Sequence, residues 1–466
     1  MFMDVTTRFP GPGDGYIPKN YDLRERGPLR MRSALQFSLN IPAVKALEIN
    51  GIQHVFQMMQ SFGMQFQNDE SPRAGLSLTL GTEVVHPRDV TVSYGTLAND
   101  GRYIGYTHIY RITDAAGNEL VPTHTPPIGA SVITPQASYV MTDILAGNTA
   151  PRQNPIWGAF AVRDEEGNRR PAALKTGTNN DANDLVAFGY LAPPDQAGRE
   201  AGQYALAVGA WSGNSDGSVV TTPQNPVFST DVTAPMWSGF LSEVSADWPI
   251  YDFVRPEGLV DVNVDAWSGL RPGPYSTETV RELFIDGTVP GDDTTKRGLP
   301  VIVDLEGNLY LWTEGCPGIP ETRGFLVLDD VEADHPAWQE ANRDWIARAR
   351  EGPGVRGGPD ERVKTETSYF LNGRYTPYGD SWGAPFPPEL SCDLAPSPSP
   401  SESPSPSPSE SPSESPSEEP TAPPTTAPPT TPPPTTPPPT TPPPTTPPPT
   451  SPPPTSPPPS EPPPSP

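Results

Sequence analysis

The sequence Leu174-Lys175-Thr176-Gly177-Thr178 completes a strand-like run that begins at Ala172, and a polar loop at 179–184 follows it. These residue types at a strand edge suit an extended, anionic substrate. The ammonium supplies a positive charge, the threonine hydroxyls hydrogen-bond a carboxylate, and the glycine lets a second backbone approach. The same triplet also fits an ordinary strand that ends in a turn, and taken alone it favours that simpler structure.

The neighbouring segments predict a sheet with helices around it. Two further strand-like runs occupy 185–192 and 204–211, with a surface turn at 193–202 between them. A helix is predicted to begin at Thr134-Pro135 and to stop at Gly147, and another spans 232–244. Three adjacent strands with helices before and after them predict an α+β fold in which helices cover an antiparallel sheet.

The segment before this sheet is mostly helical. The first thirty residues are rich in turn-forming residues, and we expect neither a helix nor a strand in them. A helical pattern from Leu29 leads into Ser38-Leu39-Asn40-Ile41-Pro42, where Ser38 or Asn40 fits a position near the helix cap. Further helices are predicted at 53–62 and 87–99, and a strand at 106–112.

Beyond about residue 248 the pattern changes to short alternating runs at 261–265, 301–305, 309–312 and 325–328, followed by one helix at 335–350. We prefer core packing to carbohydrate binding for the tryptophans of that helix. The sequence therefore predicts three segments: a partial domain at 1–247, a small, mostly β extension at 248–392, and a disordered tail at 393–466.

The C-terminal tail differs so much in composition from the rest of the chain that the two must be considered separately. From Pro396 it consists almost entirely of Pro, Ser, Thr and Glu, which favours disorder or polyproline II. It is either a spacer that reaches through a cell wall or a low-complexity end without a selected role. It holds six glutamates and no basic residue, so about −20 of the net charge of −26 belongs to the rest of the chain. So acidic a protein is a poor partner for nucleic acid.

Neither the cysteines nor the apolar runs decide whether the protein is cytosolic or exported. Cys316 and Cys392 are two free thiols if the protein is cytosolic, and a disulfide is the better prediction if it is exported. The sequence contains neither an apolar run of membrane-spanning length nor a signal-peptide pattern. The protein is then either cytosolic or targeted by a segment upstream, and the wall-like tail favours the second possibility.

Two motifs with their surroundings resemble a known family. Ser38-Leu39-Asn40 opens a helix, and Lys175-Thr176-Gly177 lies on a strand 137 residues later. Together with the segments 16–20, 29–45, 188–190 and 253–258, they resemble the transpeptidase domain of high-molecular-weight, class A penicillin-binding proteins over roughly residues 1–290. That family carries Ser-x-x-Lys, Ser-x-Asn and Lys-Thr-Gly in this order.

The chain departs from the family at the first motif. Its five lysines are preceded, three positions earlier, by tyrosine, proline, alanine, aspartate and glutamate, so none completes Ser-x-x-Lys. We therefore expect a C-terminal fragment, with the transpeptidase fold incomplete at its N-terminus. Its nucleophile, glycosyltransferase domain and membrane anchor would lie upstream. Leu174 also stands where the family usually has glycine, so the setting of the lysine differs slightly.

The resemblance implies cross-linking of the cell wall by serine acyl transfer. A peptidoglycan stem peptide that ends in D-Ala-D-Ala would be the acyl donor, and β-lactams would bind the intact parent protein as its mimics. Ser38 would help to move a proton to the leaving amine, and Asn40 would orient the substrate amide or the missing lysine. Lys175 would stabilise local negative charge and help to place the substrate carboxylate. Thr176 and Thr178 would bind that carboxylate, with the Thr178 N–H as part of an oxyanion hole. The substrate would run as an extra strand along the lysine strand, which includes Gly177. The resemblance implies neither a cofactor nor a metal, and it places the parent protein outside the cytoplasm, in the cell envelope.

Two alternatives remain at this stage. A wall-associated structural or binding module would keep the sheet and lose the chemistry, and it fits the acidic body and the long tail. A serine β-lactamase-like hydrolase shares the motifs. The absent nucleophile counts equally against that hydrolase, and the tail and the segment 253–258 favour the synthase family.

Overall fold

The computed structural model describes residues 1–11, 13–67, 73, 75–121, 129–179, 182–222, 226–365, 369–371, 374–376 and 382–392. The described residues lie within one compact unit, Met1–Ser397. The tail predicted at 393–466 falls outside them. None of the described helices combines the length and the apolar character that crossing a bilayer requires.

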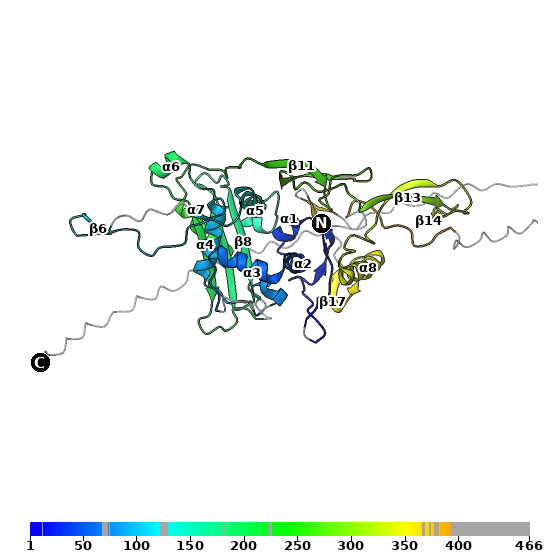
Figure 1. Cartoon of the computed structure of the whole chain (residues 1–466), viewed down its shortest axis with the longest axis horizontal. Helices are drawn as coiled ribbons and strands as arrows, with labels where there is room; N and C mark the ends of the chain where they lie inside the picture. Colours follow the sequence, from blue (N-terminus) through cyan, green and yellow to red (C-terminus); the bar gives the residue numbers. More distant parts are fainter. Residues whose placement is uncertain are drawn as a thin grey trace, which may run out of the picture. The chain divides into compact units, whose positions relative to one another are not determined.

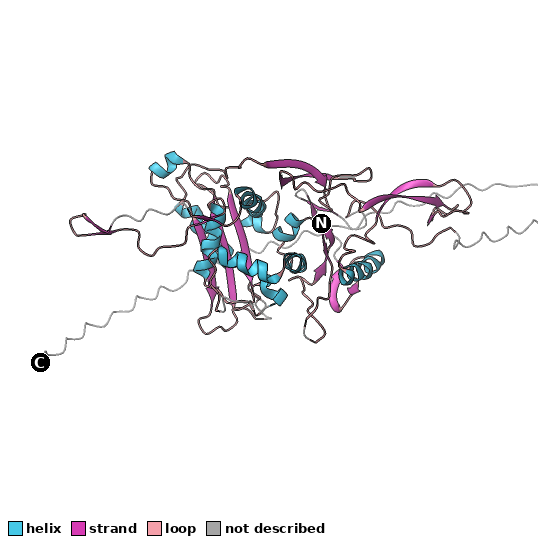
Figure 2. Ribbon diagram, in the orientation of Figure 1, coloured by secondary structure: helices cyan, strands magenta, loops and turns pink. Residues whose placement is uncertain are grey.

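A three-stranded antiparallel sheet forms the centre of the part that carries the lysine motif (Figures 1 and 2). Its strands are β8 (Ala172–Thr178), β9 (Asp184–Leu191) and β10 (Ala207–Gly213), in the order β10-β9-β8. Lys175 is opposite Phe188, which in turn is opposite Gly209. The predicted strands are therefore present, although the third begins at Ala207 and the expected turn before it contains the short helix α6 (Gln196–Glu200).

Helices cover both faces of this sheet, as the sequence predicted. On one face, α4 (Pro87–Ala98) and α5 (Pro135–Asn148) contribute to a core with Leu145, Ala173 and Tyr190. On the other face, α7 (Thr233–Val244) buries Trp237 and Leu241 against Leu174. Alternation along β8 places Lys175 on the first face and Leu174 on the second.

The helices before the sheet occupy the predicted positions, with small shifts at their ends. They are α1 (Met31–Gln36), α2 (Asn40–Asn50) and α3 (Ile52–Ser61). The 3₁₀ turn η1 (Gly75–Leu80) was not predicted. Thr134 caps α5 by accepting a hydrogen bond from the N–H of Ala137. Another 3₁₀ turn, η2 (Trp157–Phe160), follows α5.

Two predictions of strands were wrong. The first thirty residues do contain strands: β1 (Phe2–Asp4) pairs with β3 (Gly27–Leu29), and β2 (Arg24–Glu25) pairs with a distant strand. Strands of two or three residues are too short to show alternation. The predicted strand at 106–112 is reduced to β5 (Ile112–Thr113), since Tyr106, Ile109 and Tyr110 are exposed and local hydrogen bonds of Thr107 replace strand pairing. The remaining short strands nearby are β4 (Arg102–Tyr103), β6 (Glu119–Val121) and β7 (Ala130–Ser131).

The C-terminal part is mostly β with one long helix, as predicted. It comprises the hairpin β11 (Leu259–Asp265) and β12 (Thr279–Ile285), the sheet of β13 (Lys296–Val303), β14 (Leu309–Leu311) and β15 (Glu321–Leu326), helix α8 (Pro336–Glu351), and the short strands β16 (Arg356–Gly357), β17 (Asp360–Thr365), β18 (Tyr369–Leu371) and β19 (Arg374–Thr376). Strand β17 is the parallel partner of β2.

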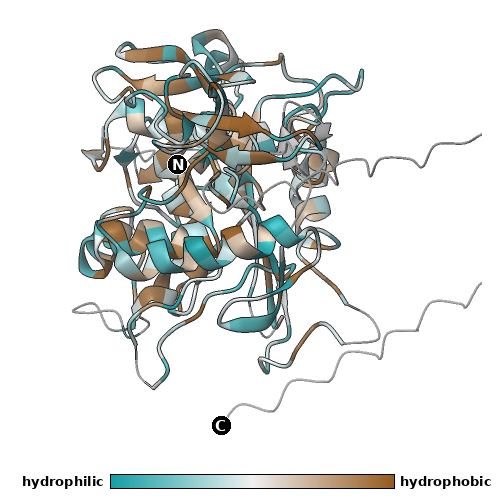
Figure 3. Cartoon of the chain, turned by 90° about the vertical axis from the view of Figure 1, so that its right-hand side faces the viewer, coloured by the Kyte–Doolittle hydropathy of each residue, from teal (hydrophilic) through white to brown (hydrophobic). Residues whose placement is uncertain are grey.

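The largest core cluster joins the two ends of this unit. Met3 and Leu29 from the first strands pack in one cluster with Trp345 of α8 and Trp382. Trp338 and Trp345 are buried, which agrees with the core packing predicted for them. The segment boundary predicted at 247/248 stays a prediction, and this cluster draws residues from both sides of it. Figure 3 shows hydrophobic and hydrophilic residues on the same helices and strands, which is the pattern of elements with one buried side.

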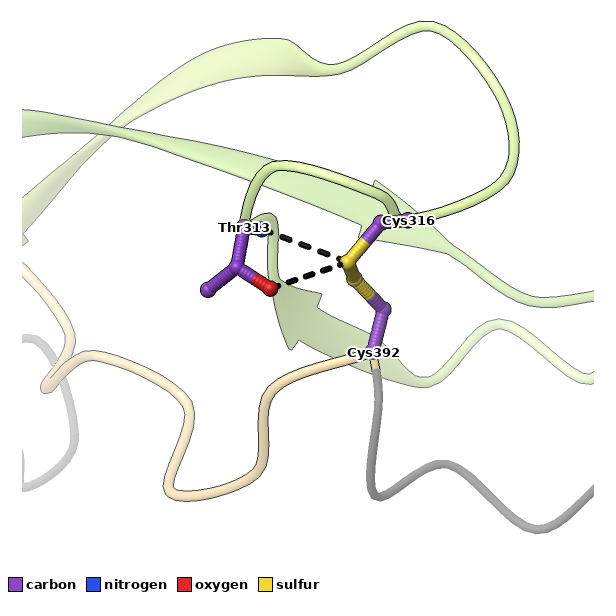
Figure 4. Close-up of a disulfide and its surroundings, with 3 residues drawn as sticks. All are labelled: Thr313, Cys316 and Cys392. Carbon is purple, nitrogen blue, oxygen red and sulfur yellow. Dashed lines mark hydrogen bonds between the residues drawn. A yellow bond between two sulfur atoms is a disulfide. The ribbon is translucent and has the colours of Figure 1, made fainter.

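Cys316 and Cys392 form a disulfide, the pairing that the sequence left open (Figure 4). The two Cα atoms are 5.8 Å apart, and Thr313 contacts the sulfur of Cys316 through its N–H and its hydroxyl. The bridge ties the end of the described chain to the loop after β14, where the N–H of Cys392 also bonds the carbonyl of Leu311. It therefore closes the last folded segment.

Candidate active site

The centre of the candidate site is a contact between Lys175 on β8 and Ser38 in the turn between α1 and α2. The ammonium nitrogen of Lys175 lies 2.6 Å from Ser38 Oγ and 2.8 Å from the carbonyl oxygen of Thr176. Within the described part of the chain, no carboxylate forms an ion pair with Lys175. Removal from water lowers the pKa of Lys175 to about 8. The site thus holds a cation that is charged below that pH and lacks a counter-ion of its own.

Ser38 occupies an unusual backbone conformation. Its φ is 55°, in the left-handed region that costs a residue with a side chain about 1 kcal/mol. The turn is held by two backbone bonds, from the N–H of Ser38 to Leu35 and from the N–H of Leu39 to Ala34. Because the hydroxyl of Ser38 meets Lys175, it does not serve the helix cap that the sequence also allowed. The N-cap of α2 is Leu39, whose apolar side chain has no acceptor to offer.

The cap of α2 comes from Asn20, a residue that the sequence analysis did not identify. Asn20 Oδ1 accepts hydrogen bonds from the N–H groups of Asn40 and Ile41, at 2.9 and 3.4 Å. Its amide nitrogen donates to Asp4 Oδ1 and to the carbonyl of Arg24, both at 2.8 Å. Asparagine is a favoured cap residue, but a cap twenty positions before its helix gives no local pattern to detect.

Asn40 lies beside Ser38 without contacting Lys175 in the bonds observed. Its side-chain amide donates to the carbonyl of Lys19 at 2.7 Å. The contact holds the Asn40 side-chain amide against the segment that precedes the helix. The structure therefore brings Ser38 to Lys175 directly, whereas Asn40 hydrogen-bonds to Lys19 and Asn20.

The two threonines of the motif lie on the face of β8 opposite to Lys175. Thr176 is buried, and its hydroxyl accepts a hydrogen bond from Trp157 Nε1 at 2.8 Å. Thr178 is exposed, and its hydroxyl lies 3.0 Å from that of Ser229. The expected convergence of both hydroxyls with the lysine is thus absent among these described side chains, because side chains alternate along a strand.

Gly177 is packed closely against the neighbouring strand. A Cβ at this position would come within 2.8 Å of the side chain of Val186 on β9. The glycine therefore serves strand packing here, whatever further use a substrate makes of it.

The outer edge of β8 is covered over its first half. Asn148, at the end of α5, donates to the carbonyl of Leu174, and Thr149 donates to that of Ala172, both at 2.7 Å. In an antiparallel strand, alternate residues direct their backbone groups to the same edge. Thr176 and Thr178 therefore direct theirs to this outer edge as well, beyond the end of the α5 cover.

The described residues contain no cluster of His, Cys, Asp or Glu arranged to hold a metal ion. The groups that the structure brings together at this site are the Lys175 ammonium, the Ser38 hydroxyl and the edge of β8.

Comparison with known proteins supplies the family context. Residues 255–295 match the family model for the C-terminal domain of penicillin-binding protein 1A. Penicillin-binding protein 1A of Clostridium botulinum strain Hall is 29% identical over 290 residues, which cover 60% of this chain and 31% of the relative. Penicillin-binding protein 2D of Bacillus subtilis is 26% identical over 281 residues, which cover 60% of this chain and 37% of the relative. The chain thus spans about a third of the length of these relatives.

A solved structure agrees with the fold. The crystal structure of penicillin-binding protein 1A from Haemophilus influenzae superimposes with a TM-score of 0.52 and 22% identity, covering 62% of this chain and 45% of that one. The predicted resemblance to class A penicillin-binding proteins and the predicted fold class are confirmed.

Proposed function

We propose that this chain, which is similar to class A penicillin-binding proteins, forms the carboxylate-binding side of a peptidoglycan D,D-transpeptidase site. The observation that carries the proposal is the 2.6 Å contact between Lys175 and Ser38, which joins the two motifs across 137 residues. An ammonium without a carboxylate partner, next to an open strand edge, suits a peptide that ends in a free carboxylate.

Each residue has a definite part in this proposal. Lys175 places the substrate carboxylate, and Ser38 passes a proton toward the leaving amine. The side-chain oxygen of Asn40 orients the substrate amide. The substrate adds to the outer edge of β8 at Thr176, Gly177 and Thr178, and the N–H of Thr178 faces the developing oxyanion. The geometry supports a role for the backbone of the two threonines but not for their hydroxyls, since both hydroxyls lie on the face of β8 opposite to Lys175.

The acylated serine must come from a Ser-x-x-Lys segment that this sequence does not contain. We therefore infer that the chain is inactive by itself. The family resemblance and the wall-like tail support a place in the cell envelope.

A non-catalytic, wall-associated binding module is the second candidate. The missing serine motif favours it, as does the bonding of Thr176 to Trp157 inside the protein. Both candidates bind peptidoglycan in a pull-down. They differ in whether the site at Lys175 recognises the terminal carboxylate of the stem peptide.

Binding of a diacetyl-Lys-D-Ala-D-Ala peptide to the full chain tests the main proposal. We expect saturable, millimolar binding by NMR titration, weakened about fivefold or more in Lys175→Gln through the loss of one charged contact. The ammonium is charged below its pKa of about 8 and neutral above it. Binding is therefore expected to be strong at pH 6.5 and to weaken as the pH rises from 7 to 9.

Two controls make the result specific. Lys364→Gln removes an exposed lysine of β17 and should leave binding unchanged. A peptide amidated at its C-terminus removes the carboxylate and should bind as weakly as the Lys175 variant does. Equal binding of the acid and the amide would disprove carboxylate recognition at Lys175.

A further inference from the structure

We propose a second ligand site, a cleft between α1, α5 and the β11–β12 hairpin that binds a dianionic ligand with carboxylate or phosphate groups. The cleft has a volume of about 430 Å³, which is the size of a small-molecule site. It is separate from the strand edge at Lys175, and its lining comes from three elements far apart in the sequence. The proposal does not depend on the proposed transpeptidase function.

The charge of the lining favours an anion. Five arginines and three carboxylates line the cleft: Arg30, Arg32, Arg152, Arg255 and Arg281, with Asp143, Asp261 and Glu282. With all eight groups ionised, the lining carries two excess positive charges. The net charge of the whole chain is −26, so the charge of this cleft is opposite in sign to that of the molecule. Two excess charges match a dianion.

Two of the three carboxylates are each shared by two arginines, and Asp143 pairs with Arg32 alone. Glu282 accepts from Arg30 at 2.6 Å and from Arg32 at 2.7 Å, while Arg32 also reaches Asp143 at 2.5 Å. Arg30 also donates through Nε to the carbonyl of Ala266 at 3.0 Å, so Arg30 and Arg32 are engaged mainly within the protein. Burial would raise the pKa of Glu282, but its bonds to Arg32 and Arg30 lower that pKa below the ordinary value, so the carboxylate stays ionised.

A second shared carboxylate lies on the hairpin side. Asp261 accepts from Arg255 at 2.6 Å and from Arg281 at 2.7 Å, and the hydrogen bond from Arg281 is the main reason why its pKa is lowered. Arg152 is exposed at the rim and forms no ion pair with any described residue. Arg152 and Arg281 are therefore the guanidinium groups freest to turn toward a ligand.

Ion pairing alone accounts for only part of this arrangement. The contacts that tie the hairpin to α1 are those of Glu282 with Arg30 and Arg32, and they involve neither Arg152 nor Arg281. Arg152 and Arg281 line the same cleft, and an anion bound there would offset the excess positive charge of the lining. Planar guanidinium forks recognise carboxylate and phosphate oxygens with two parallel hydrogen bonds, which identifies the ligand chemistry.

Isothermal titration of the full chain with succinate, inorganic phosphate and acetate, at matched ionic strength, tests the proposal. We expect at least one dianion to bind and acetate to bind about tenfold or more weakly. Binding of succinate alone identifies a dicarboxylate site, binding of phosphate alone a phosphate site, and binding of both a general dianion site. Affinity should also fall as sodium chloride is raised, because the contacts are ionic.

The double variant Arg152→Gln/Arg281→Gln locates the binding. Both side chains are exposed and Asp261 keeps Arg255, so the fold should be retained, and the dissociation constant should rise about tenfold or more. Arg323→Gln, which changes an exposed arginine of β15 outside the cleft, should leave it unchanged. The proposal is overturned if neither dianion binds better than acetate, or if the double variant binds like the unchanged chain.

Discussion

A fluorescent penicillin is expected to leave no covalent label on this 466-residue chain. Labelling requires an activated serine, and the sequence contains no Ser-x-x-Lys motif to supply one. Loss of a serine nucleophile lowers the rate of acyl transfer by about 10³-fold or more, so no labelled band should survive denaturing electrophoresis. A surviving band would show that another nucleophile in the chain is acylated.

The complementary experiment restores the missing part. The chain is fused behind the Ser-x-x-Lys segment of a class A relative, where we expect a labelled band to appear. In that fusion, Lys175→Ala should slow labelling about 10²-fold, because the cation that holds the carboxylate of the β-lactam is lost. Lys364→Ala serves as the matched control and should label at the unchanged rate. Equal rates for both variants would remove Lys175 from the site.

Gly27→Ala is expected to destabilise the folded unit by about 3 kcal/mol or more. Gly27 begins β3 with a φ of 72°, and an added Cβ would overlap the ring of Trp345. That ring has little space to move, since it is fully buried and packs edge-on against Trp382, with the ring centroids 5.1 Å apart. Urea unfolding, followed by tryptophan fluorescence, measures the change in the free energy of unfolding.

Gly217→Ala separates the two causes of this loss. Gly217 has nearly the same φ, 71°, but a Cβ there would meet nothing within 4 Å. It should therefore cost only the backbone strain of about 1 kcal/mol. Similar losses for the two variants would mean that the contact with Trp345 contributes nothing and that the core joining the two ends of the unit is looser than described.

Elements with strong local signals were predictable from the sequence. Helix α5 has a threonine cap and a proline in its first turn, and both are found in place. The lysine strand and its two partners are apolar runs bounded by polar turns, so three adjacent strands in an antiparallel sheet could be predicted, whereas the order β10-β9-β8 came from the structure. The shortest strands were missed, because two or three residues cannot show a period.

The motif residues also divide into features that the sequence predicts and features that only the structure shows. Residue types and order alone pointed to Ser38 and Lys175, and the period of a strand already places Thr176 on the opposite face from Lys175. What lies on each face is a different matter, because it depends on which helix packs there. The partners observed, Trp157 for Thr176 and Ser229 for Thr178, come from segments whose placement no local pattern encodes.

The sequence by itself determined the α+β class, the lysine strand, the helices around it, the acidic body and the absence of a Ser-x-x-Lys motif. Only the tertiary structure decided that Ser38 meets Lys175, that Asn20 caps α2, and that five arginines gather in one cleft. The physical reason is the separation along the sequence between the residues that interact. Helix and strand propensities depend on neighbours a few positions away, whereas these contacts join residues whose proximity exists only once the core has packed.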